Sequence, residues 1–180
     1  SVIRMSGKEC ERVLKKLTLK KLPKERVLTL RNFYFPNSKK LIDRCLVAWM
    51  PGPNSYTGED SIEIYPHGGD AVFQSFFQAL ISFSNVRYAE QGEFSKRAII
   101  NGKIDLVQAE AVNDLINSQT EKQRELAISQ YDRGLSIPVN RWRKELINCM
   151  ALIEANIDFS DENDTPDNLN INKELIKLKI

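Results

Sequence analysis

The chain has 180 residues, of which 42% are hydrophobic and 28% charged, and its 26 basic and 24 acidic side chains leave a net charge of only +2. So balanced a charge argues against binding to nucleic acid by bulk electrostatic attraction, although Lys and Arg crowd residues 8–40. The three scattered cysteines exclude a disulfide framework or a cysteine-based zinc site, and no apolar run reaches the roughly 18 residues that a membrane span needs.

The first half of the chain alternates predicted strands with two predicted helices. Ser6 and Glu9 have the S-x-x-E spacing of a capping box, which predicts a helix directly after a short strand over residues 2–5. Further strands are predicted over 26–35, 41–50, 61–65 and 86–89, and a second helix over 70–83, where apolar residues repeat at helical spacing. These elements predict a mixed α+β domain over residues 1–102.

Beyond Gly102 the pattern is helical. Helices are predicted over 105–118, 120–135 and 139–157, with Pro138 expected to break the path before the last of them. Residues 158–167 hold five acidic side chains and no apolar pattern, so a linker is predicted there, followed by a helix over 173–180. Residues 103–180 are therefore predicted to form the first part of a helical domain, and both ends of the chain are expected to be cut from a longer protein.

Two segments are rich in residues that bind ligands. On the strand over 61–65, Glu63 lies on the face opposite to Ile62 and Ile64, where a fixed carboxylate suits a ligand edge with two parallel N–H donors, as a pterin or a guanine has. The alternative is a solvent-facing Glu on a half-exposed sheet. Gly102 can adopt a positive φ and so turn Lys103 back toward the sheet, or it is an ordinary glycine at a helix end.

Several kinds of active site are excluded. His67 is the only histidine, so neither a histidine-based triad nor a multi-histidine metal site is expected, and no catalytic residue or metal ligand is assigned. Neither the P-loop pattern G-x-x-x-x-G-K-S/T nor the dinucleotide pattern G-x-G-x-x-G occurs in the sequence. We therefore expect that this chain alone does not bind GTP in the usual way and is not a complete enzyme.

Consecutive motifs carry a family resemblance. P-x-P-N-S-Y-T-G-E-D, then E-I-x-x-H-G-G, then G-E-F-S-x-R-A-x-x-N-G-K-I-D-L-x-Q-A-E-A resembles the tRNA modification GTPases called MnmE or TrmE, and so do I-R-M-S-G near the start and I-E-A-N-I-D-F-S near the end. The resemblance implies a tetrahydrofolate-binding-type α+β domain, followed by the start of a helical domain. In that family a G domain, which binds GTP, Mg²⁺ and K⁺, is inserted after the acidic linker, and we expect none within these 180 residues.

The resemblance also implies a cofactor and partners. Members bind a 5-substituted tetrahydrofolate, such as the 5-formyl or 5,10-methylene form, and the matching positions here are Arg4, Glu63 and Lys103. They dimerise through the N-terminal domain and act with a flavoprotein of the MnmG or GidA type. Together the two proteins add an aminomethyl-type group to the wobble uridine of tRNA. This chain departs from the family pattern at Tyr65-Pro66, at Gln91 in place of a proline and at Ile99 in place of an aromatic residue.

Two other functions stay open at this point. A stand-alone folate-dependent aminomethyltransferase would share the folate-binding fold, and a non-catalytic dimerisation module would share only the interface. The E-Q-G-E-F variant and the Asn- and Lys-rich composition favour a mitochondrial member of the family, with a cytoplasmic one as the alternative.

Overall fold

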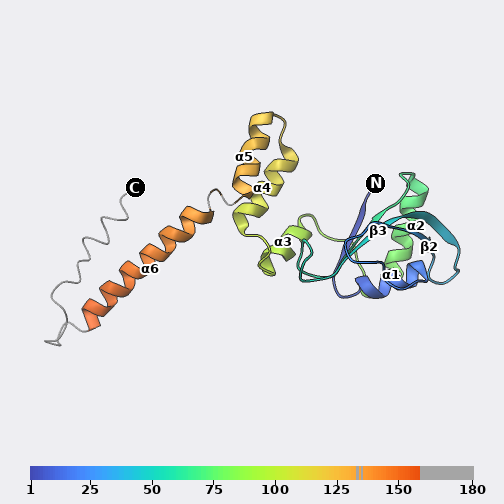
Figure 1. Ribbon diagram of the computed structural model, residues 1–180, viewed down its shortest axis with the longest axis horizontal. Helices are drawn as coiled ribbons and strands as arrows, with labels where there is room; N and C mark the ends of the chain where they lie inside the picture. Colours follow the sequence, from blue (N-terminus) through green and yellow to red (C-terminus); the bar gives the residue numbers. More distant parts are fainter. Residues whose placement is uncertain (133, 135, 159–180) are drawn as a thin grey trace. The chain divides into compact units, whose positions relative to one another are not determined.

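The computed structural model describes residues 1–132, 134 and 136–158 (Figure 1). The chain divides into two compact units, the first over Ser1–Asp105 and the second beginning at Leu106. The predicted linker over 158–167 lies, apart from Asp158, outside the described residues, and the predicted helix over 173–180 lies wholly outside them.

The first unit is built on a four-stranded sheet. Its strands are β1 (Ile3–Ser6), β2 (Thr29–Tyr34), β3 (Leu41–Met50) and β4 (Ser61–Tyr65). They lie in the order β1-β4-β3-β2, and each neighbouring pair is antiparallel. The predictions for β3 and β4 match to the residue, and the α+β class is confirmed.

Two helices cover one face of this sheet. In α1 (Cys10–Thr18) the residues Cys10, Val13, Leu14 and Leu17 are fully buried, at the i, i+3, i+4, i+7 spacing of a single helix face. α2 (Asp70–Ile81) adds Phe76, whose ring packs edge to face against that of Phe33, with 5.3 Å between the ring centroids. Because Ile62 and Ile64 belong to the same core, alternation along β4 places Glu63 on the opposite, open face of the sheet.

The predicted capping box is wrong. Ser6 is the last residue of β1, and its hydroxyl group contacts Thr57 Oγ1 at 2.6 Å and Glu59 Oε2 at 3.2 Å. Glu9 is the N-cap residue of α1 but makes no capping hydrogen bond, and its carboxylate pairs with Arg12 at 3.0 Å. Contacts with a loop distant in the sequence have displaced the local motif that the spacing predicts.

The strand predicted over 86–89 is also absent. Those residues have no regular secondary structure, and the sheet ends at β1. Val86 packs against the core, whereas Arg87 and Tyr88 are exposed, so the apolar alternation does not mark a strand here. The first unit instead closes with a helix, α3 (Glu93–Ile100).

The second unit is helical over its described residues, as predicted. Helices α4 (Leu106–Asn117) and α5 (Glu121–Tyr131) pack against each other, and α5 begins at a reciprocal capping box between Thr120 and Gln123. α6 (Ser136–Asp158) begins before Pro138, which lies in its first turn, where a missing N–H breaks no helical hydrogen bond. Pro138 therefore does not break the helix. No helix in the described part of the chain is long and apolar enough to cross a membrane.

Candidate functional site

Arg4 and Glu63 form an ion pair on the open face of the sheet. The two residues are direct partners in the register of β1 and β4. Arg4 Nε donates to Glu63 Oε1 at 2.8 Å, and Arg4 Nη2 lies 2.7 Å from the same oxygen. The guanidinium also lies over the ring of Phe94, with 5.9 Å between its central carbon and the ring centroid. Two of the three positions singled out by the resemblance are thus in direct contact.

The second oxygen of Glu63 is held by Tyr65. The Tyr65 hydroxyl group donates to Oε2 at 2.6 Å, from the same strand and the same face of the sheet. Desolvation raises the pKa of Glu63, but the hydrogen bonds from Tyr65 and Arg4 and the charge of Arg4 outweigh it, so the pKa lies below its ordinary value. The carboxylate is therefore ionised and fixed at both oxygens.

Lys103 lies beside the loop that precedes β4. Gly102 has φ +64°, as expected from the sequence, and Lys103 N donates to Ala98 O at 2.8 Å in the turn after α3. The stem of Lys103 passes over Gly58, since a Cβ placed there would lie 3.2 Å from Lys103 Cγ. Among the described residues, no ion pair joins Lys103 to Glu63.

Buried Thr57 connects the end of β1 to the end of α3. Thr57 is fully buried in the loop before β4. Its Oγ1 contacts the Ser6 hydroxyl group at the end of β1, and its carbonyl oxygen accepts a 2.7 Å hydrogen bond from Asn101 Nδ2 at the end of α3. The strand that carries Arg4 and the turn that carries Lys103 are therefore fixed to the same residue.

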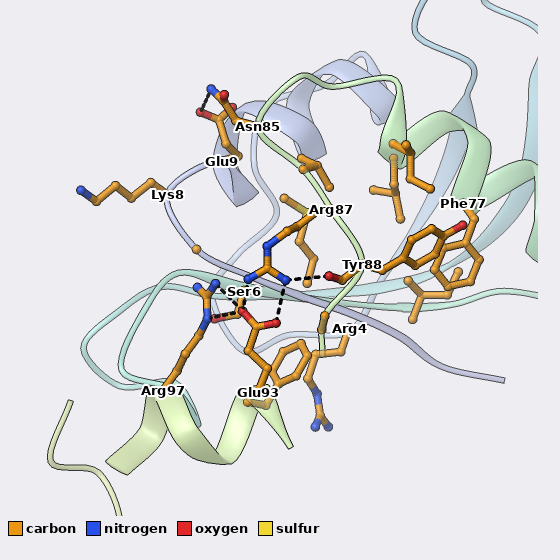
Figure 2. Close-up of a pocket in the computed structure, with 18 of the residues that line it drawn as sticks. Arg4, Ser6, Lys8, Glu9, Phe77, Asn85, Arg87, Tyr88, Glu93 and Arg97 are labelled. Carbon is orange, nitrogen blue, oxygen red and sulfur yellow. Dashed lines mark hydrogen bonds and ion pairs between the residues drawn. The ribbon is translucent and has the colours of Figure 1, made fainter. Parts of the chain in front are cut away.

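A network of charges fixes α3 to this region. Glu93 accepts hydrogen bonds from Arg87 at 2.8 and 2.9 Å and from Arg97 at 2.8 and 3.1 Å (Figure 2). Arg97 also donates to Glu59 Oε2 at 2.9 Å. The hydrogen bonds from Arg87, from the Glu90 N–H group and from Arg97 lower the pKa of Glu93 to about 2. Arg87 and Arg97 are therefore both paired with carboxylates of the protein itself.

A cavity of about 620 Å³ opens along β1, the strand at the sheet's edge. It is lined by apolar residues of α2, by the segment 85–89, by residues of β1 and by the charged residues Glu93 and Arg97. Arg4 borders this cavity, whereas Glu63 and Lys103 do not line it, and Figure 2 shows the Arg4 side chain directed away from Arg87 and Tyr88. We place the candidate site at the Arg4–Glu63 pair because a carboxylate that is ionised and held at both oxygens lies there.

His67 and the buried cysteines have other surroundings. The backbone N–H of His67 donates to Asp43 Oδ2 at 3.0 Å, and its ring Nδ1 lies 2.9 Å from Asp43 Oδ1, in the turn between β4 and α2. This pair joins the turn between β4 and α2 to Asp43 on β3. Burial raises the pKa of Cys10 and of Cys45 to about 12, so neither is a thiolate near neutral pH.

The sequence analysis identified Arg4, Glu63 and Lys103 as candidate positions but did not predict the contacts that surround them. Tyr65 is two residues from Glu63 on the same strand, so period-two alternation could have paired them. The Glu93–Arg97 contact has the i, i+4 spacing of a helical ion pair and could have been predicted too. The link from Arg97 to Glu59 spans 38 residues and has no local signal.

Two family models match the chain in succession. The model described as GTP-binding protein TrmE N-terminus matches residues 1–103, and the model described as MnmE helical domain matches residues 106–180. Together they cover nearly all of the sequence, in the order implied by the motifs.

Individual relatives agree with these matches. The chain is 46% identical over 167 residues to the tRNA modification GTPase MnmE of Methylobacterium radiotolerans, covering 93% of this chain and 38% of the relative. It is 44% identical over 162 residues to the mitochondrial 5-taurinomethyluridine-[tRNA] synthase subunit GTPB3 of Danio rerio, covering 90% of this chain and 32% of the relative. The MnmE of Pelagibacter ubique is 42% identical over 169 residues. The chain spans about a third of the length of these relatives.

Proposed function

The chain belongs to the MnmE (TrmE) family of tRNA modification GTPases, and we propose that its first unit binds a 5-substituted tetrahydrofolate through Arg4, Glu63 and Lys103. The observation that carries the proposal is the ionised carboxylate of Glu63, fixed on a rigid strand at the open face of the sheet. A pterin presents an amino group and a ring N–H side by side, and a carboxylate accepts two such parallel donors.

The two cations suit the remainder of the ligand. The Arg4 side chain is 48% exposed, so its guanidinium can leave Glu63 without losing a buried position. Lys103 is exposed in the turn after α3. Both can face anionic or carbonyl groups of the folate, which carries carboxylates on its glutamate tail and a carbonyl group on the pterin.

The longer protein is proposed to form a homodimer through this unit. Leu30 on β2 and Leu46 on β3 are direct cross-strand partners on the open face, and their residues are 48% and 40% exposed. Exposed apolar side chains that adjoin on the face of a sheet offer a surface that a protein partner can cover. This pair supports a second copy of the chain as the partner on that face.

We further assign residues 1–102 to a folate domain and residues 103–180 to the start of a helical domain of a longer tRNA-modifying protein. That protein would act with a flavoprotein of the MnmG type on the wobble uridine of tRNA. The Danio rerio relative is named as mitochondrial, which supports the mitochondrion as the site of action. GTP, Mg²⁺ and K⁺ are assigned to no residue of this chain, because its sequence contains no P-loop pattern.

Isothermal titration of the 180-residue chain with 5-formyltetrahydrofolate tests the folate proposal. Saturable binding of one ligand per chain is expected. Absence of heat at every accessible concentration, together with unchanged thermal stability at saturating ligand, would contradict it.

A further inference from the structure

The Glu63 carboxylate has little free hydrogen-bonding capacity. Each oxygen of a carboxylate can accept about two hydrogen bonds. Glu63 Oε1 already contacts two nitrogens of Arg4, at 2.8 and 2.7 Å, and Oε2 accepts the Tyr65 hydroxyl group at 2.6 Å. One position therefore stays open on Oε2 and none on Oε1.

Ligand binding must rearrange one of these partners. Two parallel N–H donors need one acceptor position on each oxygen, so Oε1 has to lose a contact with Arg4, whereas Oε2 can keep Tyr65 and still accept a donor. Arg4 is suited to leave, because half of its side chain is exposed and Phe94 gives its cation a second partner. Nothing requires Tyr65 to move.

We propose that Tyr65 is a positioning residue of the folate site, whose hydroxyl group keeps Glu63 oriented toward the pterin while Arg4 releases Oε1 to the ligand. This inference rests on the proposed folate function and extends it to a residue that the motif E-I-x-x-H-G-G leaves open. Tyr65 touches Glu63 rather than the ligand, so its effect passes through the carboxylate.

The other groups around Glu63 do not supply this restraint. Arg4 from β1 is the cation that contacts the carboxylate, and the β3 residue paired with Glu63 is Ala48, which carries no charge or donor. Without the Tyr65 hydroxyl group, the side chain of Glu63 would be held at one oxygen only. The hydrogen bond from Tyr65 also favours the ionised carboxylate, which is the form that accepts two donors.

The test compares Tyr65→Phe, Tyr65→Gln and wild type by isothermal titration with 5-formyltetrahydrofolate between pH 4 and 7. Tyr65→Phe keeps the ring and removes the donor, so we expect folate to bind about tenfold more weakly, with the acid limb of the binding profile shifted to higher pH. Tyr65→Gln restores a donor and should recover part of the affinity. Tyr34→Phe is the matched control, because Tyr34 lies on β2 and contacts Asn32 rather than Glu63.

The outcomes separate the two proposals. If wild type binds folate and Tyr65→Phe binds equally well with the same pH profile, the positioning role is wrong and the folate site stands. Tighter binding by Tyr65→Phe would also overturn it, because Tyr65 would then compete with the ligand. If wild type binds no folate, both proposals fail. If a variant binds folate more weakly only because it unfolds, its melting temperature will show this. The shift of the acid limb of the binding profile does not depend on how much of the protein is folded.

Discussion

Arg4 and Glu63 are cross-strand partners whose side chains meet at 2.7 Å on the open face of the sheet, with Arg4 three times as exposed as Glu63 (48% against 16%). The pair is satisfied without any ligand. An exposed ion pair of this kind contributes little to folding, typically below about 1 kcal/mol. Stability alone therefore gives little reason for the pair, and we propose that it serves ligand recognition.

Lys103→Met should weaken folate binding without destabilising the protein. The ammonium group is exposed, while the stem that passes over Gly58 is largely kept by Met. Losing a charge-assisted hydrogen bond predicts about tenfold weaker binding by isothermal titration. Lys122→Met on α5 is the control, since that exposed lysine lies in the second unit. Equal affinities for both variants would remove Lys103 from the site.

Gly58→Ala should destabilise the first unit and displace Lys103. Gly58 has φ +78°, and an added Cβ would lie 3.2 Å from both Asn101 Cβ and Lys103 Cγ. A left-handed alanine costs about 1–2 kcal/mol before any crowding, which urea unfolding would detect. Gly68→Ala is the control, because nothing lies within 4 Å of a Cβ at that position and its φ is not positive. Equal unfolding midpoints for the two variants would show that the loop relaxes freely.

The Glu93 network should make stability fall in acid. The pKa of Glu93 is lowered to about 2 in the folded protein, so its contribution is complete above the unfolded pKa of about 4.5 and is lost as the pH falls toward 2. Urea unfolding at a series of pH values should show this loss in wild type and less of it in Glu93→Gln. Glu125→Gln, an exposed change on α5, should follow wild type. Parallel pH profiles for wild type and Glu93→Gln would contradict the assignment.

Leu46→Asp should shift the chain from dimer to monomer. A charge on the exposed Leu30–Leu46 pair would be buried by the proposed partner, which is costly without a counter-charge. Size-exclusion chromatography with light scattering measures the mass directly. Ile100→Asp is the control, since Ile100 is also exposed but lies on α3 and outside the sheet. Wild type that stays monomeric at high micromolar concentration would rule out the dimer.

Much of the first unit could be predicted from the sequence because its patterns are local. Alternation identifies β3 and β4 to the residue, and helical spacing finds α2 within two residues of its end. Glycine is the residue that adopts a positive φ most readily, and Gly102 does so, with φ +64°.

The errors have a common physical cause. Ser6 and Glu9 have the spacing of a helix capping box. The Ser6 hydroxyl group instead contacts Thr57 and Glu59, which are more than 50 residues away in the sequence. Residues 86–89 alternate like a strand, yet β1 is not paired with them. The Glu59–Arg97–Glu93–Arg87 network joins a loop, a helix and an irregular segment, and only its Glu93–Arg97 contact has a local spacing that predicts it.

The most direct test of the folate site is a paired titration of wild type and Glu63→Ala with 5-formyltetrahydrofolate. Wild type should bind one ligand per chain, and Glu63→Ala should bind more weakly by about 2–3 kcal/mol, because the charged acceptor for the pterin is gone. Glu125 is exposed on α5, so Glu125→Ala should bind folate with the affinity of wild type. If Glu63→Ala keeps both the affinity and the melting temperature of wild type, the carboxylate does not bind the ligand and the site assignment is wrong.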